Sequence, residues 1–103
     1  MAHFARIVDG VVDTVIVIDN KDCGGGDFPE SEPIGQEFIA GLGLDGEWMQ
    51  CSYTGSFRYW MPNSGYIWNG VAFVMPSPGS NWTLDEDTYQ WVSPSGSRLP
   101  VGR

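Results

Sequence analysis

Basic residues are scarce in this chain, which has five Lys and Arg against 13 Asp and Glu in 103 residues and a formal net charge of −8 at pH 7. Binding to nucleic acid needs clustered Lys and Arg on the phosphates, and an anionic membrane surface attracts basic segments in the same way. We therefore expect neither nucleic acid nor membrane as a partner. No apolar run approaches the length of a transmembrane helix, and the first residues lack the basic-then-apolar order of a signal peptide. The sequence predicts a soluble protein made in the cytoplasm.

Residues that carry catalysis or bind metals are also few. Cys23 and Cys51 are the only cysteines, and His3 is the only histidine. Two widely spaced cysteines make neither a disulfide framework nor a zinc site, so we expect free thiols, with Cys23 exposed and Cys51 buried. We find no Ser/His/Asp set, no cluster of metal ligands and no carboxylate pair with an evident partner. We expect no enzyme, and we assign no catalytic residue, cofactor or metal.

Aromatic residues and turn signals are abundant by contrast, and they predict a mainly β (α+β) fold of antiparallel hairpins with one short helix in a small single domain. The first hairpin covers residues 2–18 and closes on Asp9-Gly10, because both central residues of a type I′ turn need a positive φ. This register places Arg6 opposite Asp13, an opposite-charge pair that favours the pairing.

One helix is predicted over about residues 33–42. Ser31 suits its N-cap. Ile34, Phe38 and Leu42 recur every four residues with Ile39 beside them, and we expect this apolar stripe to pack on the sheet. The alternation that follows predicts a strand over 47–53.

Two further hairpins are predicted in tandem, over 65–76 and 82–92. The first closes on Asn69-Gly70, with Trp68 opposite Val71. The second closes on the four residues 85–88, with Trp82 opposite Trp91 on a shared aromatic face. Residues 1–94 then form the domain, and 95–103 form an irregular C-terminal arm.

The surplus of aromatics, with five Trp, has two readings that stay open: these rings fill a small core, or some face a partner. In the strand predicted over 47–53, alternation places Trp48 on the polar face, so it is the Trp that we expect to be exposed. Two kinds of partner fit exposed rings: the surface of another protein, or sugars that stack on the rings. The candidate partner-binding residues are Trp48, Tyr59, Trp60, Tyr66, Trp68, Trp82, Trp91, Arg98, Leu99 and Val101.

Several stretches resemble a family of small proteins of phages that infect aquatic bacteria, cyanophages above all. The similarity begins with Met-Ala-His-Phe-Ala-Arg-Ile at residues 1–7 and Val-Ile-Val-Ile-Asp-Asn at 15–20. It continues through Gly-Glu-Trp-Met-Gln-Cys-Ser-Tyr at 46–53, and it ends with Trp-Val-Ser-Pro at 91–94. The chain departs from the family at 59–65, where members carry a segment like Tyr-Ala-Gly-Ile-Gly.

The resemblance implies a virion structural protein, first of all a capsid decoration (cement) protein located in the virion and made in the host cytoplasm. Its partners would be other virion subunits, namely the major capsid or tail proteins, or further copies of itself. One alternative is a tail or tail-fibre accessory module that binds a receptor or glycan. A second alternative is a non-virion phage protein that acts in the host. The resemblance transfers no catalytic residue.

Overall fold

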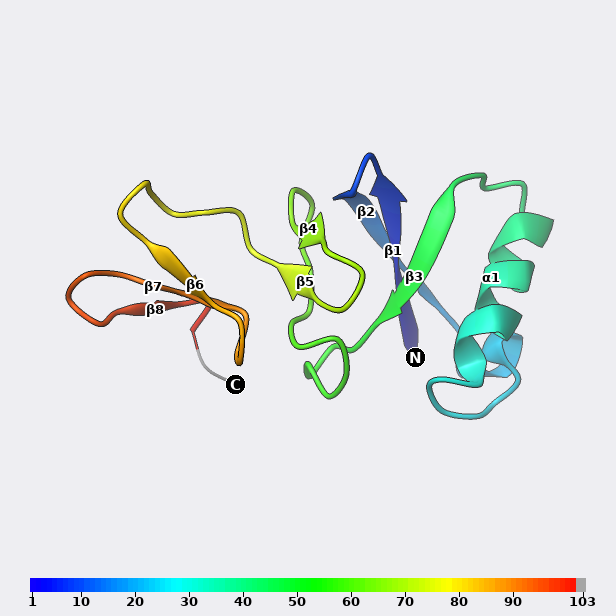
Figure 1. Ribbon diagram of the computed structural model, residues 1–103. Helices are drawn as coiled ribbons and strands as arrows, with labels where there is room; N and C mark the ends of the chain where they lie inside the picture. Colours follow the sequence, from blue (N-terminus) through cyan, green and yellow to red (C-terminus); the bar gives the residue numbers. More distant parts are fainter. Residues whose placement is uncertain (102–103) are drawn as a thin grey trace.

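Two antiparallel sheets and one α-helix make up the computed structural model, which describes residues 1–101 (Figure 1). The larger sheet has five strands in the order β3-β1-β2-β4-β5, and the smaller has the order β6-β7-β8. Helix α1 lies at one end of the molecule and the smaller sheet at the other, over extents of 47 × 25 × 17 Å. The mainly β fold with one short helix is as predicted. The elements are β1 (Ala2–Val8), β2 (Val11–Ile18), the 3-10 helix η1 (Asn20–Cys23), α1 (Ser31–Gly41), β3 (Glu47–Cys51), β4 (Ile67–Trp68), β5 (Phe73–Val74), β6 (Thr83–Asp85), β7 (Gln90–Val92) and β8 (Arg98–Leu99).

The hairpin of β1 and β2 turns at Asp9-Gly10, where both residues have a positive φ (52° and 77°), as the type I′ turn requires. A β-bulge then changes the register, so that Arg6 is opposite Thr14. The predicted pairing of Arg6 with Asp13 is therefore wrong for the backbone. The two side chains still form an ion pair, with 3.0 Å from Nε to Oδ2, because the extra residue of a bulge leaves Asp13 beside its predicted partner.

Helix α1 packs on the sheet through only part of the predicted stripe, since Ile39 is fully buried and Phe38 packs against the same core cluster. Its buried residues are Ser31, Gly35 and Ile39, whereas Ile34 and Leu42 are 45% and 56% exposed. Gly35 explains the choice of face, because it brings the helix backbone close to the sheet: a Cβ at this position would lie 2.3 Å from Phe4 Cζ. Gly35 therefore sets how closely the helix approaches the sheet, and Ile39 packs in the same core cluster as Phe4. Ser31 is also inside the helix and makes no N-cap hydrogen bond.

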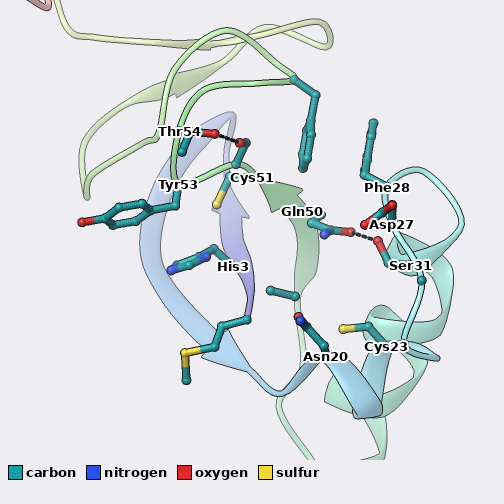
Figure 2. A pocket seen from close by; sticks show the side chains of 16 residues that line it. His3, Asn20, Cys23, Asp27, Phe28, Ser31, Gln50, Cys51, Tyr53 and Thr54 are labelled. Atoms are coloured by element: carbon teal, nitrogen blue, oxygen red, sulfur yellow. Dashed lines mark hydrogen bonds between the residues drawn. The ribbon is translucent and has the colours of Figure 1, made fainter. Parts of the chain in front are cut away.

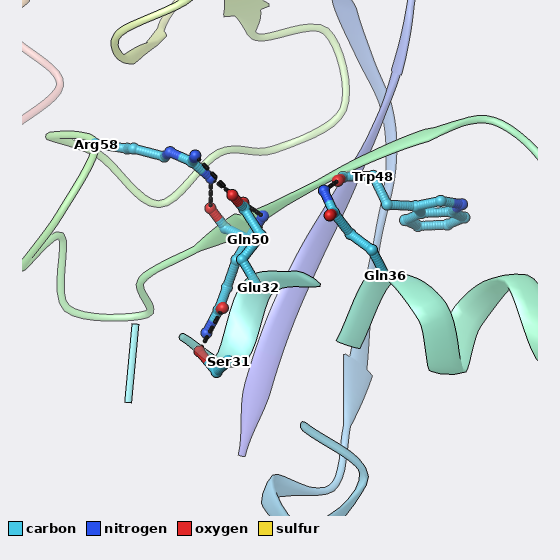
Figure 3. A network of polar contacts seen from close by, with 6 residues as sticks. All are labelled: Ser31, Glu32, Gln36, Trp48, Gln50 and Arg58. Atoms are coloured by element: carbon cyan, nitrogen blue, oxygen red, sulfur yellow. Dashed lines mark hydrogen bonds and ion pairs between the residues drawn. The ribbon is translucent and has the colours of Figure 1, made fainter. Parts of the chain in front are cut away.

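Strand β3 is an edge of the larger sheet, and polar side chains cover its outer backbone groups (Figure 3). Gln36 Nε2 donates to the Trp48 carbonyl (2.6 Å), and the Gln50 N–H donates to Glu32 Oε2 (2.7 Å). Arg58 Nη1 donates to the Gln50 carbonyl (2.8 Å), and its guanidinium pairs with both oxygens of Glu32. Since unpaired edges recruit other strands, this network closes one edge of the sheet to further pairing.

Two burial predictions in this region are wrong. Trp48 is predicted to be exposed, but it is only 5% exposed, because α1 covers its face of β3. Cys23 is buried in the same cluster rather than exposed, whereas Cys51 is buried as expected. Both thiols are free.

The hairpin of β4 and β5 forms in the predicted segment with a longer loop. Trp68 pairs with Phe73 rather than Val71, so residues 69–72 all belong to the turn. Asn69 does not have the positive φ of a type I′ turn. Its Oδ1 instead accepts hydrogen bonds from the backbone N–H groups of Val71 (2.9 Å) and Ala72 (2.7 Å), which holds the wider loop.

In the second tandem hairpin the loop lies one residue further along the chain than predicted, which shifts the strand pairing by two residues. Leu84, not Trp82, is opposite Trp91, and the loop covers residues 86–89. The C-terminal segment is also more ordered than predicted, since β8 pairs with β7 and places Leu99 opposite Trp91. A turn in which Ser93 Oγ accepts from the Ser97 N–H (2.9 Å) brings β8 back onto the sheet. Residues 102–103 of the predicted arm lie outside the described residues.

Indole N–H groups connect the smaller sheet to the rest of the molecule. Trp60 Nε1 donates to the Thr88 carbonyl (2.8 Å), and Trp91 Nε1 donates to the Met75 carbonyl (2.6 Å). These bonds join segments that are far apart in the sequence. Within residues 1–101, no helix has the length and apolar character needed to cross a membrane.

Candidate functional site: an exposed apolar row

None of the five tryptophans is exposed. Trp48 and Trp60 are buried, and Trp68, Trp82 and Trp91 are half-buried. Trp68 packs against Phe73, with ring centroids 4.8 Å apart, and the Trp91 indole is bonded to the backbone as described above. Much of the aromatic surplus therefore fills the interior and connects the two sheets.

The remaining candidate residues are divided between packing and the surface. Tyr59 meets Tyr89 edge to face at 4.6 Å, and Tyr66 packs on the second core cluster, where burial raises its pKa. Leu99 is half-buried in β8. Only Arg98 and Val101 of the predicted set are exposed, and Arg98 Nη1 bonds Asp85 Oδ2 at 2.9 Å. The structure thus does not gather the predicted residues into one surface.

A different surface is exposed and apolar. Val8, Val11 and Ile67 are 49%, 40% and 42% exposed, and they lie on three neighbouring strands. Val8 is opposite Val11, and Val11 is opposite Ile67. Directly opposed residues point to the same face of a sheet with Cβ atoms about 5 Å apart. These three side chains therefore form a continuous row, which we call the valine row, and exposed Val71 follows in the adjoining loop.

The position of the valine row explains its exposure. Side chains alternate along β1, so Val8 shares the face of Phe4 and Arg6. Phe4 is covered by α1, and Arg6 lies over the Trp48 ring at 5.5 Å and pairs with Asp13. The ion pair marks the end of the helix-covered region, and the row lies beyond it on the same face.

The chemistry of the valine row is that of a docking surface. None of its side chains titrates, so a partner in contact with it would be held by removal of apolar area from water, at about 25 cal/mol per Å². Asp9 is exposed in the turn between Val8 and Val11, and the chain as a whole carries −8. A complementary partner therefore presents apolar side chains flanked by basic ones.

A second apolar surface is found on the outer face of α1. Phe38 lies between exposed Ile34 and Leu42, and the three side chains line an open groove of about 480 Å³ with Asp22 and Glu37 at its rim. Ile34 and Leu42 are the part of the predicted stripe that is exposed, whereas Ile39 is buried. The rim of the groove is acidic, as is the turn beside the valine row.

Among residues 1–101, no three His, Cys, Asp or Glu side chains come together as a metal site. No protein family model matches the chain, and no solved structure matches it. The valine row has a partial signal in the sequence, since Val8 and Val11 flank the predicted turn. Ile67 has none, because only the pairing of β2 with β4 brings it beside them.

Proposed function

We propose that the chain is a phage virion structural protein, specifically a capsid decoration (cement) protein that binds the major capsid subunit. The resemblance of residues 1–7, 15–20, 46–53 and 91–94 to phage proteins supports a virion role. The valine row supports binding to another subunit, and it is the observation on which the proposal chiefly depends.

The partner that fits this surface is basic as well as apolar. Two copies of an acidic chain facing each other through the valine row would bring Asp9 of one copy near that of the other and would add two charges of −8. A capsid subunit with Lys or Arg around an apolar patch avoids this repulsion. A stable interface buries about 800 Å² on each partner, so the row is the centre of the contact and the surrounding loops form its rim.

Mass spectrometry of purified, washed particles of the phage that encodes the chain tests the proposal. We expect a copy number in a fixed ratio to the major capsid protein. A few copies for each particle would instead favour a tail or tail-fibre module, and absence from the particles would favour a protein that acts in the host. Either result would contradict the decoration role.

The surface itself is tested by adding the purified chain to particles that lack it. Val11→Asp places a charge in the valine row, and we expect binding to weaken at least about tenfold, which is about 1.4 kcal/mol. Val17→Asp is the matched control, because Val17 is on the same strand, is 47% exposed, and is opposite His3 on the other face. Equal loss of binding in both variants would refute the assignment of the row.

A further inference from the structure

A cavity of about 310 Å³ lies where β1 begins and β3 ends (Figure 2). Four separate segments line it: the first residues of the chain, η1 with the loop that follows it, the start of α1, and residues 50–57. The valine row is at the opposite end of β1, so the cavity is a separate feature. Its volume is within the range of small-molecule sites.

Aromatic rings form part of the cavity wall. Phe28 and Phe57 stack with ring centroids 3.9 Å apart and an interplanar angle of 7°, which joins the two loops. Tyr53 is 73% exposed, and its ring lies against the His3 imidazole at 5.5 Å. Tyr53 therefore places an exposed phenol ring at the edge of the cavity, with its hydroxyl directed away from Gln50 and Ser31 (Figure 2).

The rest of the wall is polar. Gln50 accepts a hydrogen bond from Ser31 Oγ through Oε1 (2.7 Å), which fixes the amide in the wall. Asn20 and Asp27 are exposed at the rim. Asp27 is the one Asp or Glu side chain among the described lining residues, Met1 brings the N-terminal ammonium, and burial lowers the pKa of His3.

The two lining thiols are also neutral. Burial raises the pKa of Cys51 to about 12 and raises that of Cys23, so neither is a thiolate at neutral pH. The wall thus combines flat apolar rings with amide, hydroxyl and carboxylate groups. A ligand that matches it has an apolar face and several hydroxyl groups at its edge.

We propose that this cavity binds a neutral saccharide unit, with the Tyr53 ring against the apolar face of the sugar. Asp27 accepts hydrogen bonds from sugar hydroxyls, and the Asn20 amide both donates and accepts. Lys and Arg side chains are absent from the lining of the cavity in the described part of the chain. The inference goes beyond the decoration role and does not depend on it.

A titration of the full ¹⁵N-labelled chain with glucose, galactose, mannose and N-acetylglucosamine tests the site by NMR. We expect at least one sugar to give saturable shifts in the amides of Asn20, Asp27 and Tyr53. Tyr53→Ala should weaken that binding about tenfold, the upper range for one aromatic contact, whereas Tyr53→Phe should retain most of it because the ring remains. Asp27→Asn should also weaken binding, and Glu86→Gln, at an exposed acid in the distant smaller sheet, should not.

Three outcomes would overturn the proposal. The first is the absence of saturable shifts with any of the four sugars up to about 50 mM, well above millimolar affinity. The second is unchanged affinity in Tyr53→Ala. The third is saturation by ethylamine but by no sugar, which would identify Asp27 as a site for cationic amines. None of these outcomes bears on the copy number of the chain in virions, so the two proposals fail separately.

Discussion

Gly35→Ala should destabilise the protein, although the same substitution is usually favourable in a helix. Alanine exceeds glycine in helix propensity by about 1 kcal/mol. At Gly35, however, the new Cβ would lie 2.3 Å from Phe4 Cζ and 3.1 Å from Cys23 Sγ. Phe4 is fully buried on a central strand, so its ring has no open space to enter.

The magnitude follows from two opposing effects. Overpacking of a core costs about 1–3 kcal/mol, and a contact of 2.3 Å places this site at the upper end. Subtracting the propensity gain leaves a loss of about 2 kcal/mol in the free energy of unfolding. For a domain of this size, that loss lowers Tm by about 10 °C.

Urea unfolding followed by circular dichroism measures this loss, with Gly41→Ala as the control. Gly41 is in the same helix, and a Cβ there meets nothing within 4 Å. We expect Gly41→Ala to leave stability unchanged or to raise it by up to about 1 kcal/mol. Phe4→Leu, which removes the clashing ring, should cost less in the Gly35→Ala background than in the wild type. The reasoning is refuted if Gly35→Ala is as stable as the wild type, or if Gly41→Ala loses as much.

Three further predictions concern charged and titratable groups. Arg58→Lys removes the guanidinium that bonds both oxygens of Glu32, and we expect urea denaturation to show a loss of about 1–3 kcal/mol in the free energy of unfolding. Arg98→Lys is the control, because this arginine is exposed and the substitution should leave the free energy of unfolding nearly unchanged. The hydrogen bond from Arg98 lowers the pKa of Asp85, so this pair stabilises the folded state above the ordinary carboxyl pKa, and the contribution is lost as pH falls through the lowered pKa. In Arg98→Met, an NMR titration should show the pKa of Asp85 rising towards its ordinary value. Burial raises the pKa of Cys51 to about 12, so this thiol favours the folded state below its ordinary pKa near 9, and the contribution is lost as pH rises towards 12. At pH 8 Cys51 should react with a thiol reagent only after denaturation, and rapid labelling of the native protein would contradict its burial.

The sequence by itself determined where the chain turns and which stretches form strands or a helix. Asp9-Gly10 forms the predicted type I′ turn, because the preference of these residues for positive φ is local. Strands lie within each predicted strand or hairpin segment, and α1 covers Ser31–Gly41 where 33–42 was predicted. Alternation and helical periodicity are properties of neighbouring residues, so they need no tertiary information.

Register and burial were decided only in the folded molecule. The Asn69 side chain lengthens its turn, and Trp68 therefore has a different partner from the one that a two-residue turn implies. The helix contacts the sheet through Gly35 and Ile39 and leaves Ile34 and Leu42 exposed, because close contact with Phe4 requires the absence of a side chain at position 35. Trp48 is buried because the helix covers its face of the sheet, and alternation along the strand does not say which face the helix will cover.

Both proposed sites also belong to the tertiary structure. Val8 and Val11 are neighbours through a local turn, whereas Ile67 joins them only because β4 pairs with β2. Segments far apart in the sequence likewise enclose the cavity beside Tyr53. Strand pairing and loop packing place distant residues within a few ångströms of one another, and no local pattern of turns or alternation encodes which distant residues will meet.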